Sequence, residues 1–418
     1  MKKTKIGLSA ICFLLVFAML FSFAGCAVEV QAADLMNGIS AKKVSGKAAD
    51  DTFIGSQAEL AVKLFKACVD ENSNNVLISP LSIQLALAMT ANGADGQTKE
   101  EMEKLLGGNI PLEDLNEYLY TYVNSLPSDE KCELEIANSI WFRDDADRIS
   151  VEKDFLQTNA DYYGAQAYKE PFNQQTVKDI NSWVNEHTNG MIKEILKEMP
   201  VAAVMCLINA IAFEAEWESV YDKYDVTDGI FTSIAGEKRK VKMMNSTENK
   251  YIETENAKGV IKNYKDGKYA FAALLPDEDV NIYDYINGLT GESLIAALNG
   301  AETESVITAI PKFSYEYGLN MNDILMELGM PTAFKDSADF SKMADTTDKS
   351  FFIGDVIHKT YIDVDEQGTK AAAITGVLTF DCAAVAPEKE VILDRPFVYM
   401  IIDNATNLPI FIGTVTDF

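Results

Sequence analysis

The chain has 418 residues, 48% of them hydrophobic and 24% charged, a composition typical of a folded globular protein. It is strongly acidic, because 64 Asp and Glu outnumber 36 Lys and Arg and give a formal net charge of −28. A field of that sign repels phosphate backbones, which argues against nucleic-acid binding. Only two histidines are present and no cysteines form a CxxC pair, so we expect no metal site and no cofactor.

The first residues have the pattern of an export signal. Three lysines within the first five residues precede an apolar stretch over about residues 6–23, and Ala-Gly then leads into Cys26. This resembles a bacterial lipoprotein signal, in which residues 1–25 are removed and Cys26 carries the lipid. Two alternatives remain open, namely secretion after cleavage near Ala32 and retention of the apolar stretch as an anchor. In each case we expect a secreted or cell-surface protein that touches a membrane only through its N-terminus.

Residues 26–54 are small and polar with little periodicity, and we interpret them as a tether between the signal and the folded body. From Gly55 onward the chain shows no linker, no low-complexity tract and no internal repeat. This favours one large domain over residues 55–418.

The order of secondary structure indicates the fold class. Helical spacing behind good capping residues predicts helices over 55–71, 79–94, 98–108 and 177–196. The last of these is expected to break at Asn189 and to resume as a short second helix. The second half predicts strands over 268–277 and 305–318 and a closing hairpin over 397–418. Helices followed by strands indicate an α+β domain built around antiparallel sheet.

No motif of enzyme chemistry is present. The chain has no GxSxG elbow, HExxH pair, Walker loop or GxGxxG turn. Asp363-Val-Asp365-Glu-Gln-Gly368 imitates the start of a calcium loop, but its twelfth position is Ile374 where a bidentate Glu is required. We therefore expect a protein that is not an enzyme.

Seven segments between residues 74 and 415 occur in the order found in the serpin family, and the resemblance covers roughly residues 55–418. They are NNVLISPLSIQLALAMTANGADGQT, INSWVNEHTNGMI, LINAIAFEAEW, IPKFSYEYGLNMNDILMELGM, FKDSADFSKM, IHKTYIDVDEQGTKAAA and DRPFVYMIIDNATNLPIFIGTV. The resemblance implies helices packed on three mainly antiparallel sheets, with an exposed reactive-centre loop at about residues 366–390. It also implies a monomer that inhibits a serine protease as a suicide substrate, through a covalent complex. The alternative within the family is a non-inhibitory binding protein that is cleaved without trapping.

The hinge of that loop consists mainly of small residues, which suits insertion into a sheet. The resemblance assigns to it Glu366, Gly368, Thr369, Ala371, Ala372 and Ala373. After cleavage the loop must enter a sheet as an extra strand, and alternate residues such as Thr369, Ala371 and Ala373 then face a close-packed core. Small side chains fit there, Gly368 is expected to supply backbone freedom, and Lys370 should face outward. An alanine-rich surface loop would explain the composition but not its place in the chain.

Two further constellations follow from the resemblance. Ser79, Ser82, Asn209 and His358 map onto the shutter, where the sheet parts beneath a helix, and their role is conformational. Trp217 maps onto the breach, where the loop first enters. The simpler interpretations are a hydrogen-bonded core histidine and an ordinary core tryptophan.

The bond that is cut decides the target protease. Counting forward from Glu366 by the family spacing places the cut at Cys382-Ala383, whereas counting back from Pro396 points toward Ala384 or Val385. All of these residues are small and none is basic, which favours an elastase-like protease with a shallow pocket. Phe380 would offer a chymotrypsin-like site if the cut is displaced.

Overall fold

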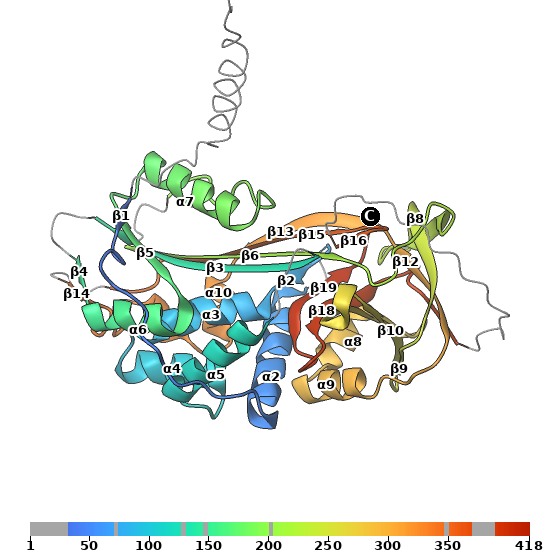
Figure 1. Ribbon diagram of the computed structural model, residues 1–418, viewed down its shortest axis with the longest axis horizontal. Helices are drawn as coiled ribbons and strands as arrows, with labels where there is room; N and C mark the ends of the chain where they lie inside the picture. The colour runs from blue at the N-terminus through green and yellow to red at the C-terminus, as the bar shows by residue number, and fades with distance from the viewer. Residues whose placement is uncertain are drawn as a thin grey trace, which may run out of the picture.

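The computed structural model describes residues 32–70, 74–126, 131–144, 149–199, 204–346, 351–369 and 389–418. One long β-sheet runs through the middle of the molecule, and most helices lie on one side of it (Figure 1). Helix α7 (Gln174–His187) covers the opposite side of this sheet (Figure 1). A six-stranded and a four-stranded sheet lie toward one end of the molecule (Figure 1).

Four helices lie close to where capping residues and helical spacing predict them, namely α2 (Asp51–Cys68), α3 (Pro80–Ala91), α4 (Gly96–Gly107) and α7. The other α-helices of the described residues were not predicted, and these five are α5 (Leu112–Ser125), α6 (Lys153–Tyr163), α8 (Ile282–Gly288), α9 (Gly291–Asn299) and α10 (Asn322–Glu327). Helix α3 is buried at every residue, and Ser79 caps its start by accepting a hydrogen bond from the backbone N–H of Ser82. Within the described ranges, no helix combines the length and the apolar character that a membrane span requires.

The predicted second helix after Asn189 is absent, because the described residues 188–199 contain no helix. Asn189 and Gly190 both adopt positive φ angles, 49° and 78°, which end α7. The side chain of Asn181 then accepts hydrogen bonds from the backbone N–H groups of Ile195 and Leu196 at 2.8 and 3.0 Å. These bonds replace the intrahelical bonds that a second helix would need.

The described part of the predicted tether is packed on the folded body. Residues 33–34 form strand β1 (Ala33–Asp34) at the edge of the long sheet, and the backbone N–H of Leu35 donates to Ala167 at 2.9 Å. Helix α2 begins at Asp51, because the Asp50 side chain caps it. The prediction of a tether over 26–54 therefore fails from residue 32 onward. Apolar residues such as Leu35 were too sparse in this polar segment to show a period.

Seven strands form the long sheet. Their order is β1, β5 (Gln166–Glu170), β3 (Cys132–Arg143), β6 (Met205–Glu216), β16 (Gly368–Thr369), β15 (Asp355–Val364) and β13 (Phe313–Asn320). Strands β3 and β6 pair antiparallel along their whole length, as do β13 and β15. The inner neighbours β6 and β15 are parallel and pair directly only at residues 206–209 and 355–358.

Two further sheets complete the fold. The six-stranded sheet has the order β2 (Leu77–Ile78), β19 (Pro409–Val415), β18 (Phe397–Asp403), β11 (Tyr269–Pro276), β10 (Ala257–Asn263) and β9 (Tyr251–Glu253). The four-stranded sheet has the order β17 (Lys389–Ile392), β12 (Val306–Pro311), β8 (Lys238–Glu248) and β7 (Val226–Thr232). A two-stranded pair joins β14 (Ala344–Thr346) to β4 (Ile149–Val151). Every residue of β11, β18 and β19 is buried, so the six-stranded sheet lies in the core.

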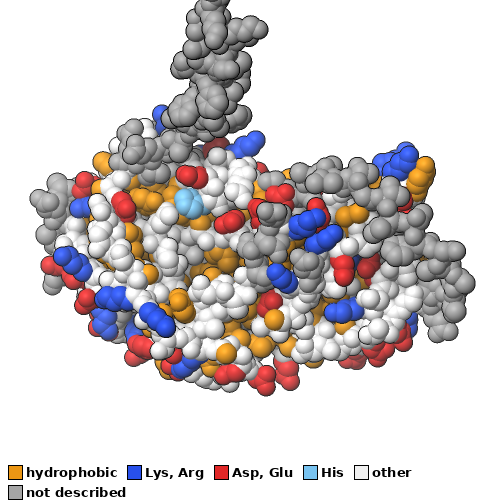
Figure 2. Space-filling model, viewed as in Figure 1, with side chains coloured by type: hydrophobic (Ala, Val, Ile, Leu, Met, Phe, Trp, Pro, Cys, Tyr) orange, Lys and Arg blue, Asp and Glu red, His pale blue; other side chains and the backbone are white. Residues whose placement is uncertain are grey.

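This architecture confirms the predicted α+β fold of helices on three mainly antiparallel sheets. The closing hairpin predicted over 397–418 is present as β18 and β19. On the face shown in Figure 2, acidic and basic side chains are interspersed and no broad basic surface is visible.

A glycine where two helices meet offers a test of this packing. Gly291 begins α9, its N–H donates to Glu59 on α2, and a Cβ at this position would lie 2.3 Å from the Glu59 backbone nitrogen. We expect Gly291→Ala to lower the free energy of unfolding by about 1–3 kcal/mol in urea denaturation, because the helices must move apart. Gly288→Ala is the matched control, since a Cβ at Gly288 meets open space. Equal effects of the two substitutions would contradict the packing described here.

Candidate functional site

The long sheet is incompletely paired at its centre. At one end β6 and β15 are direct neighbours, and at the other end the two residues of β16 separate them. Between these points, residues 210–214 of β6 and 359–363 of β15 have no strand pairing with each other among the described residues. We call this stretch the seam. Its two sides present strand edges that could accept one more strand.

The residues of β16 already lie at the top of the seam. Thr369 pairs with Ala215 on one side and with Val364 on the other, and its side chain is buried against the hydroxyl of Tyr264. A Cβ on Gly368 would lie 1.9 Å from the Ala215 carbonyl oxygen, whereas the φ angle of Gly368 is not positive. Gly368 is therefore required for close approach to β6, and the backbone freedom expected of it during hinge movement stays a prediction.

The turn before β16 is held by hydrogen bonds to three consecutive backbone carbonyls. We call residues 365–367 the hinge turn. The indole N–H of Trp217 donates to the carbonyl of Asp365 at 2.8 Å, and its backbone N–H donates to that of Gln367 at 2.8 Å. The backbone N–H of Tyr221 donates to the carbonyl of Glu366 at 3.0 Å. Trp217 is fully buried and stacks on Tyr264, so the donors are fixed in place.

Glu366 extends from this turn to form an ion pair with Lys312, whose chain position follows β12. Burial raises the pKa of the Glu366 carboxyl, but the hydrogen bond and charge of Lys312, together with a backbone hydrogen bond, lower it by more. Its net pKa lies below the ordinary value, so the pair is ionised at neutral pH. Both side chains are about one-third exposed, and such pairs add little stability.

The four residues predicted for the shutter lie together at the lower end of the seam. His358 on β15 is the register partner of Asn209 on β6, and its Nε2 accepts a hydrogen bond from the backbone N–H of Ser79 at 3.1 Å. Ser79 in turn caps α3 at Ser82. The sequence analysis missed Asn138 on β3, whose side-chain oxygen accepts from the Asn209 amide. The available signal was an amide within the segment IANSIWF, most of whose other residues are apolar.

This cluster contains polar atoms that lack partners. His358 is 1% exposed, and burial lowers its pKa to about 3, so the ring is neutral and carries its proton on Nδ1. Within the described part of the chain, His358 Nδ1, Asn209 Oδ1 and Ser82 Oγ have no hydrogen-bond partner. Buried unpaired polar groups are costly, so the cluster can gain bonds by rearranging.

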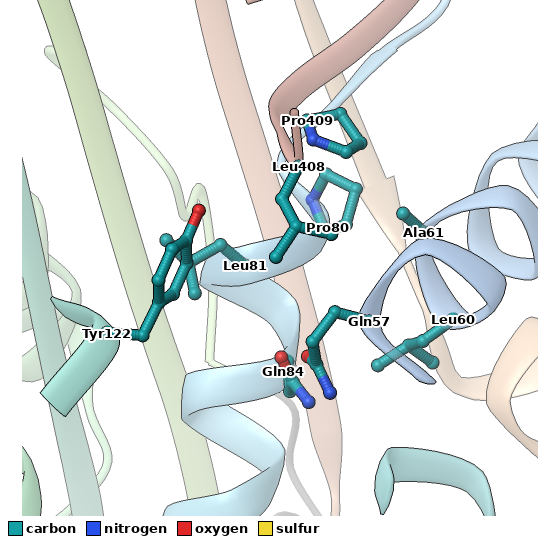
Figure 3. A pocket seen from close by; sticks show the side chains of 9 residues that line it. All are labelled: Gln57, Leu60, Ala61, Pro80, Leu81, Gln84, Tyr122, Leu408 and Pro409. Atoms are coloured by element: carbon teal, nitrogen blue, oxygen red, sulfur yellow. The ribbon is translucent and has the colours of Figure 1, made fainter. Parts of the chain in front are cut away.

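Two hollows lie away from the seam, and the larger, an open pocket of about 330 Å³, lies between α2 and the end of α4. No group of three or more His, Cys, Asp or Glu among them could hold a metal ion. A cavity of about 20 Å³ lies between α2, α3, α5 and the start of β19, and it has room for little more than one water molecule (Figure 3). The remaining predicted site residues, Ala371, Ala372, Ala373, Cys382, Ala383, Ala384, Val385 and Cys26, lie outside the described residues.

Titration of His358 predicts how stability depends on pH. The unfolded histidine binds a proton below about pH 6.5, whereas the native one does so only near pH 3, so the free energy of unfolding falls as the pH drops through this window. Between pH 6.5 and 5 this amounts to about 2 kcal/mol, and His358→Gln should remove it from the pH profile of urea unfolding.

Glu170 provides the opposite control. Burial of Glu170, together with the hydrogen bond and charge of Asp179, raises the pKa of its carboxyl to about 7. Its contribution to the free energy of unfolding therefore grows as the pH falls from about 7 to 4.5. Glu170→Gln should therefore change the pH slope in the opposite direction from His358→Gln. A pH profile that His358→Gln leaves unchanged would contradict a buried neutral imidazole.

Comparison with known proteins agrees with this geometry. The serpin (serine protease inhibitor) family matches residues 55–418. A serine protease inhibitor of Cyanea capillata is 29% identical over 371 residues, covering 86% of this chain and 97% of its own. The crystal structure of the thermophilic serpin tengpin in its native state is similar with a TM-score of 0.89 and 51% identity, covering 93% of this chain and all of that one. Tengpin in its latent state gives a TM-score of 0.79 at 47% identity, covering 89% and 100%. The chain therefore belongs to the serpin family.

Proposed function

We propose that this protein inhibits elastase-like serine proteases by inserting its own cleaved loop into the seam. One observation carries the proposal, namely that Gly368 and Thr369 already lie between β6 and β15 directly above a stretch without pairing. Continuation of the chain beyond Thr369 would supply the missing strand. Each added residue would gain backbone hydrogen bonds on both sides.

The topology explains why cleavage would be the trigger. Thr369 lies in the long sheet, whereas Lys389 begins β17, which pairs with β12 in the four-stranded sheet. While both ends are held in different sheets, the intervening chain cannot lie along the seam to its full length. A protease that forms an acyl-enzyme within this chain frees one end, and insertion then carries the bound protease away from its starting position.

The chemistry of the bait residues suggests the target. The bond between Cys382 and Ala383, or one at Ala384 or Val385, would present a small side chain to the protease. A shallow, apolar pocket accepts such residues, whereas a pocket with an acidic floor gains little from them. Phe380 is the site we expect if the cut lies nearer the hinge.

We assign conformational roles to the two clusters beside the seam. Trp217, with the hinge turn, would act as the breach where insertion starts. Ser79, Ser82, Asn209 and His358 would act as the shutter, because their unpaired polar atoms can find partners when β6 and β15 separate. Neither cluster takes part in bond cleavage, which the protease performs.

We further infer that the protein acts outside the cytoplasm as a monomer. The location is supported by the export-signal pattern over residues 1–25. In its most specific form, the proposal is a bacterial lipoprotein with the lipid attached at Cys26. Mass spectrometry of the mature N-terminus distinguishes lipid on Cys26 from cleavage near Ala32.

Incubation with pancreatic elastase tests the inhibitory function. We expect a covalent complex that survives denaturing gel electrophoresis, because insertion distorts the protease before the acyl-enzyme is hydrolysed. Trypsin should form little or none, since none of the residues 380–386 is basic. Cleavage by elastase without a complex would instead favour a non-inhibitory serpin, and rapid cleavage by trypsin alone would refute the assigned bond.

A substitution at the top of the seam tests the insertion mechanism. Thr369→Arg would place a charged side chain in the buried site beside Tyr264, at a cost of several kcal/mol. We expect elastase to cleave this variant at the parent rate while the covalent complex is lost. Lys370→Arg is the control, because strand alternation would point this residue outward once the loop is inserted. If Thr369→Arg still traps elastase, insertion past this position is not the mechanism.

A further inference from the structure

A lysine is buried behind the hinge turn. Lys262, on β10, is 2% exposed, and no other lysine or arginine of the described residues is buried to this degree. Its Nζ donates to Glu248 Oε1 at 2.7 Å, on β8 of the neighbouring sheet. Burying an ammonium group is unfavourable unless it is paired, and even a paired ion adds little stability compared with an apolar residue. Stability therefore gives no evident reason for a lysine at this position.

The ammonium group of Lys262 contacts two aromatic rings. Its Nζ lies 4.5 Å from the ring centre of Tyr221 and 5.6 Å from that of Trp217. Both distances are within the range of cation–π attraction, which is strongest in desolvated sites. These are the two residues whose N–H groups donate to the three carbonyls of the hinge turn.

A polar network ties this contact to the four-stranded sheet. Ser246 Oγ lies 2.6 Å from Glu248 Oε1, 3.2 Å from the Tyr221 hydroxyl and 2.9 Å from Thr308 Oγ1. Tyr221 is thus held at its hydroxyl by β8 and on its ring face by Lys262. One continuous cluster therefore contains Glu248, which accepts from Lys262, the ring of Tyr221, and Ser246, which contacts the Tyr221 hydroxyl.

We propose that Lys262 is a positioning residue for the hinge. Anchored by Glu248, its ammonium group fixes the rings of Trp217 and Tyr221, so that their N–H groups hold residues 365–367 and keep Thr369 in register at the top of the seam. The effect on inhibition, unlike the geometry, rests on the proposed function. A hinge that is already in register can begin insertion at once, because no rearrangement has to come first. A loosened hinge inserts more slowly, so the protease has time to hydrolyse the acyl-enzyme and dissociate.

Hydrogen–deuterium exchange of the intact protein tests the positioning role without any protease. The probes are the backbone amides of Trp217 and Tyr221, which donate to the hinge turn. In the double variant Lys262→Met with Glu248→Gln, which leaves no buried charge unpaired, we expect these two amides to exchange about tenfold faster. Lys262→Arg keeps the cation and should retain the parent rates. Lys258→Met is the matched control on the same strand and should also leave them unchanged.

Two outcomes would overturn the proposal. Unchanged exchange at Trp217 and Tyr221 in the double variant would show that the cation does not hold these residues. An equal acceleration of the amides of β11, in the core of the six-stranded sheet, would show that Lys262 has only a general structural role.

The functional consequence is measured separately with pancreatic elastase. For the double variant we expect the moles of inhibitor consumed per mole of elastase trapped to rise about twofold or more, with the rate of loop cleavage unchanged. If exchange accelerates locally but this ratio does not change, Lys262 positions a hinge that does not limit insertion, and the functional part of the proposal is wrong. If the parent protein itself forms no complex, the inhibitory function fails and the exchange result still decides the positioning role.

Discussion

The missing pairing between β6 and β15 is the feature on which the rest of the structure depends. Strands β6 and β15 each pair along one edge, with β3 and β13, and meet each other directly over only four residues each. Each unpaired strand edge forgoes backbone hydrogen bonds that a further strand could supply. We propose that the native fold thereby keeps free energy in reserve, and that the neighbouring clusters determine when it is released.

The two ends of the seam are held by different kinds of interaction. At the top, Gly368 and Thr369 occupy the first positions of the absent strand, and Trp217 and Tyr221 hold the turn that precedes them. At the bottom, His358 and its neighbours are buried with polar atoms left unpaired. Under the proposed function, insertion would begin at the top, and the bottom would rearrange when the inserted strand reaches it.

The sequence predicted structural features that depend on residues close together in the chain. It did not predict features that depend on contacts between residues far apart in the chain. Ser79 before Pro80 predicted the start of α3, because an N-cap acts within its own helix turn. The role of Lys262 could not be predicted, because its partner Glu248 lies in another sheet and the aromatic rings come from a distant loop. The interpretation of residues 32–54 as a tether failed for the same reason, since only tertiary contacts give their few apolar side chains a place to pack.

Thermal unfolding before and after a single cut tests the reserve of free energy most directly. Limited digestion with elastase, with the cut located between residues 380 and 386 by mass spectrometry, should leave the two fragments associated. We expect the apparent melting temperature then to rise by roughly 10 °C or more, because a strand of about ten residues gains pairing on both sides. A melting temperature that is unchanged or lower after the cut would contradict the proposed reserve of free energy, since the freed chain would then have gained no strand pairing in the seam.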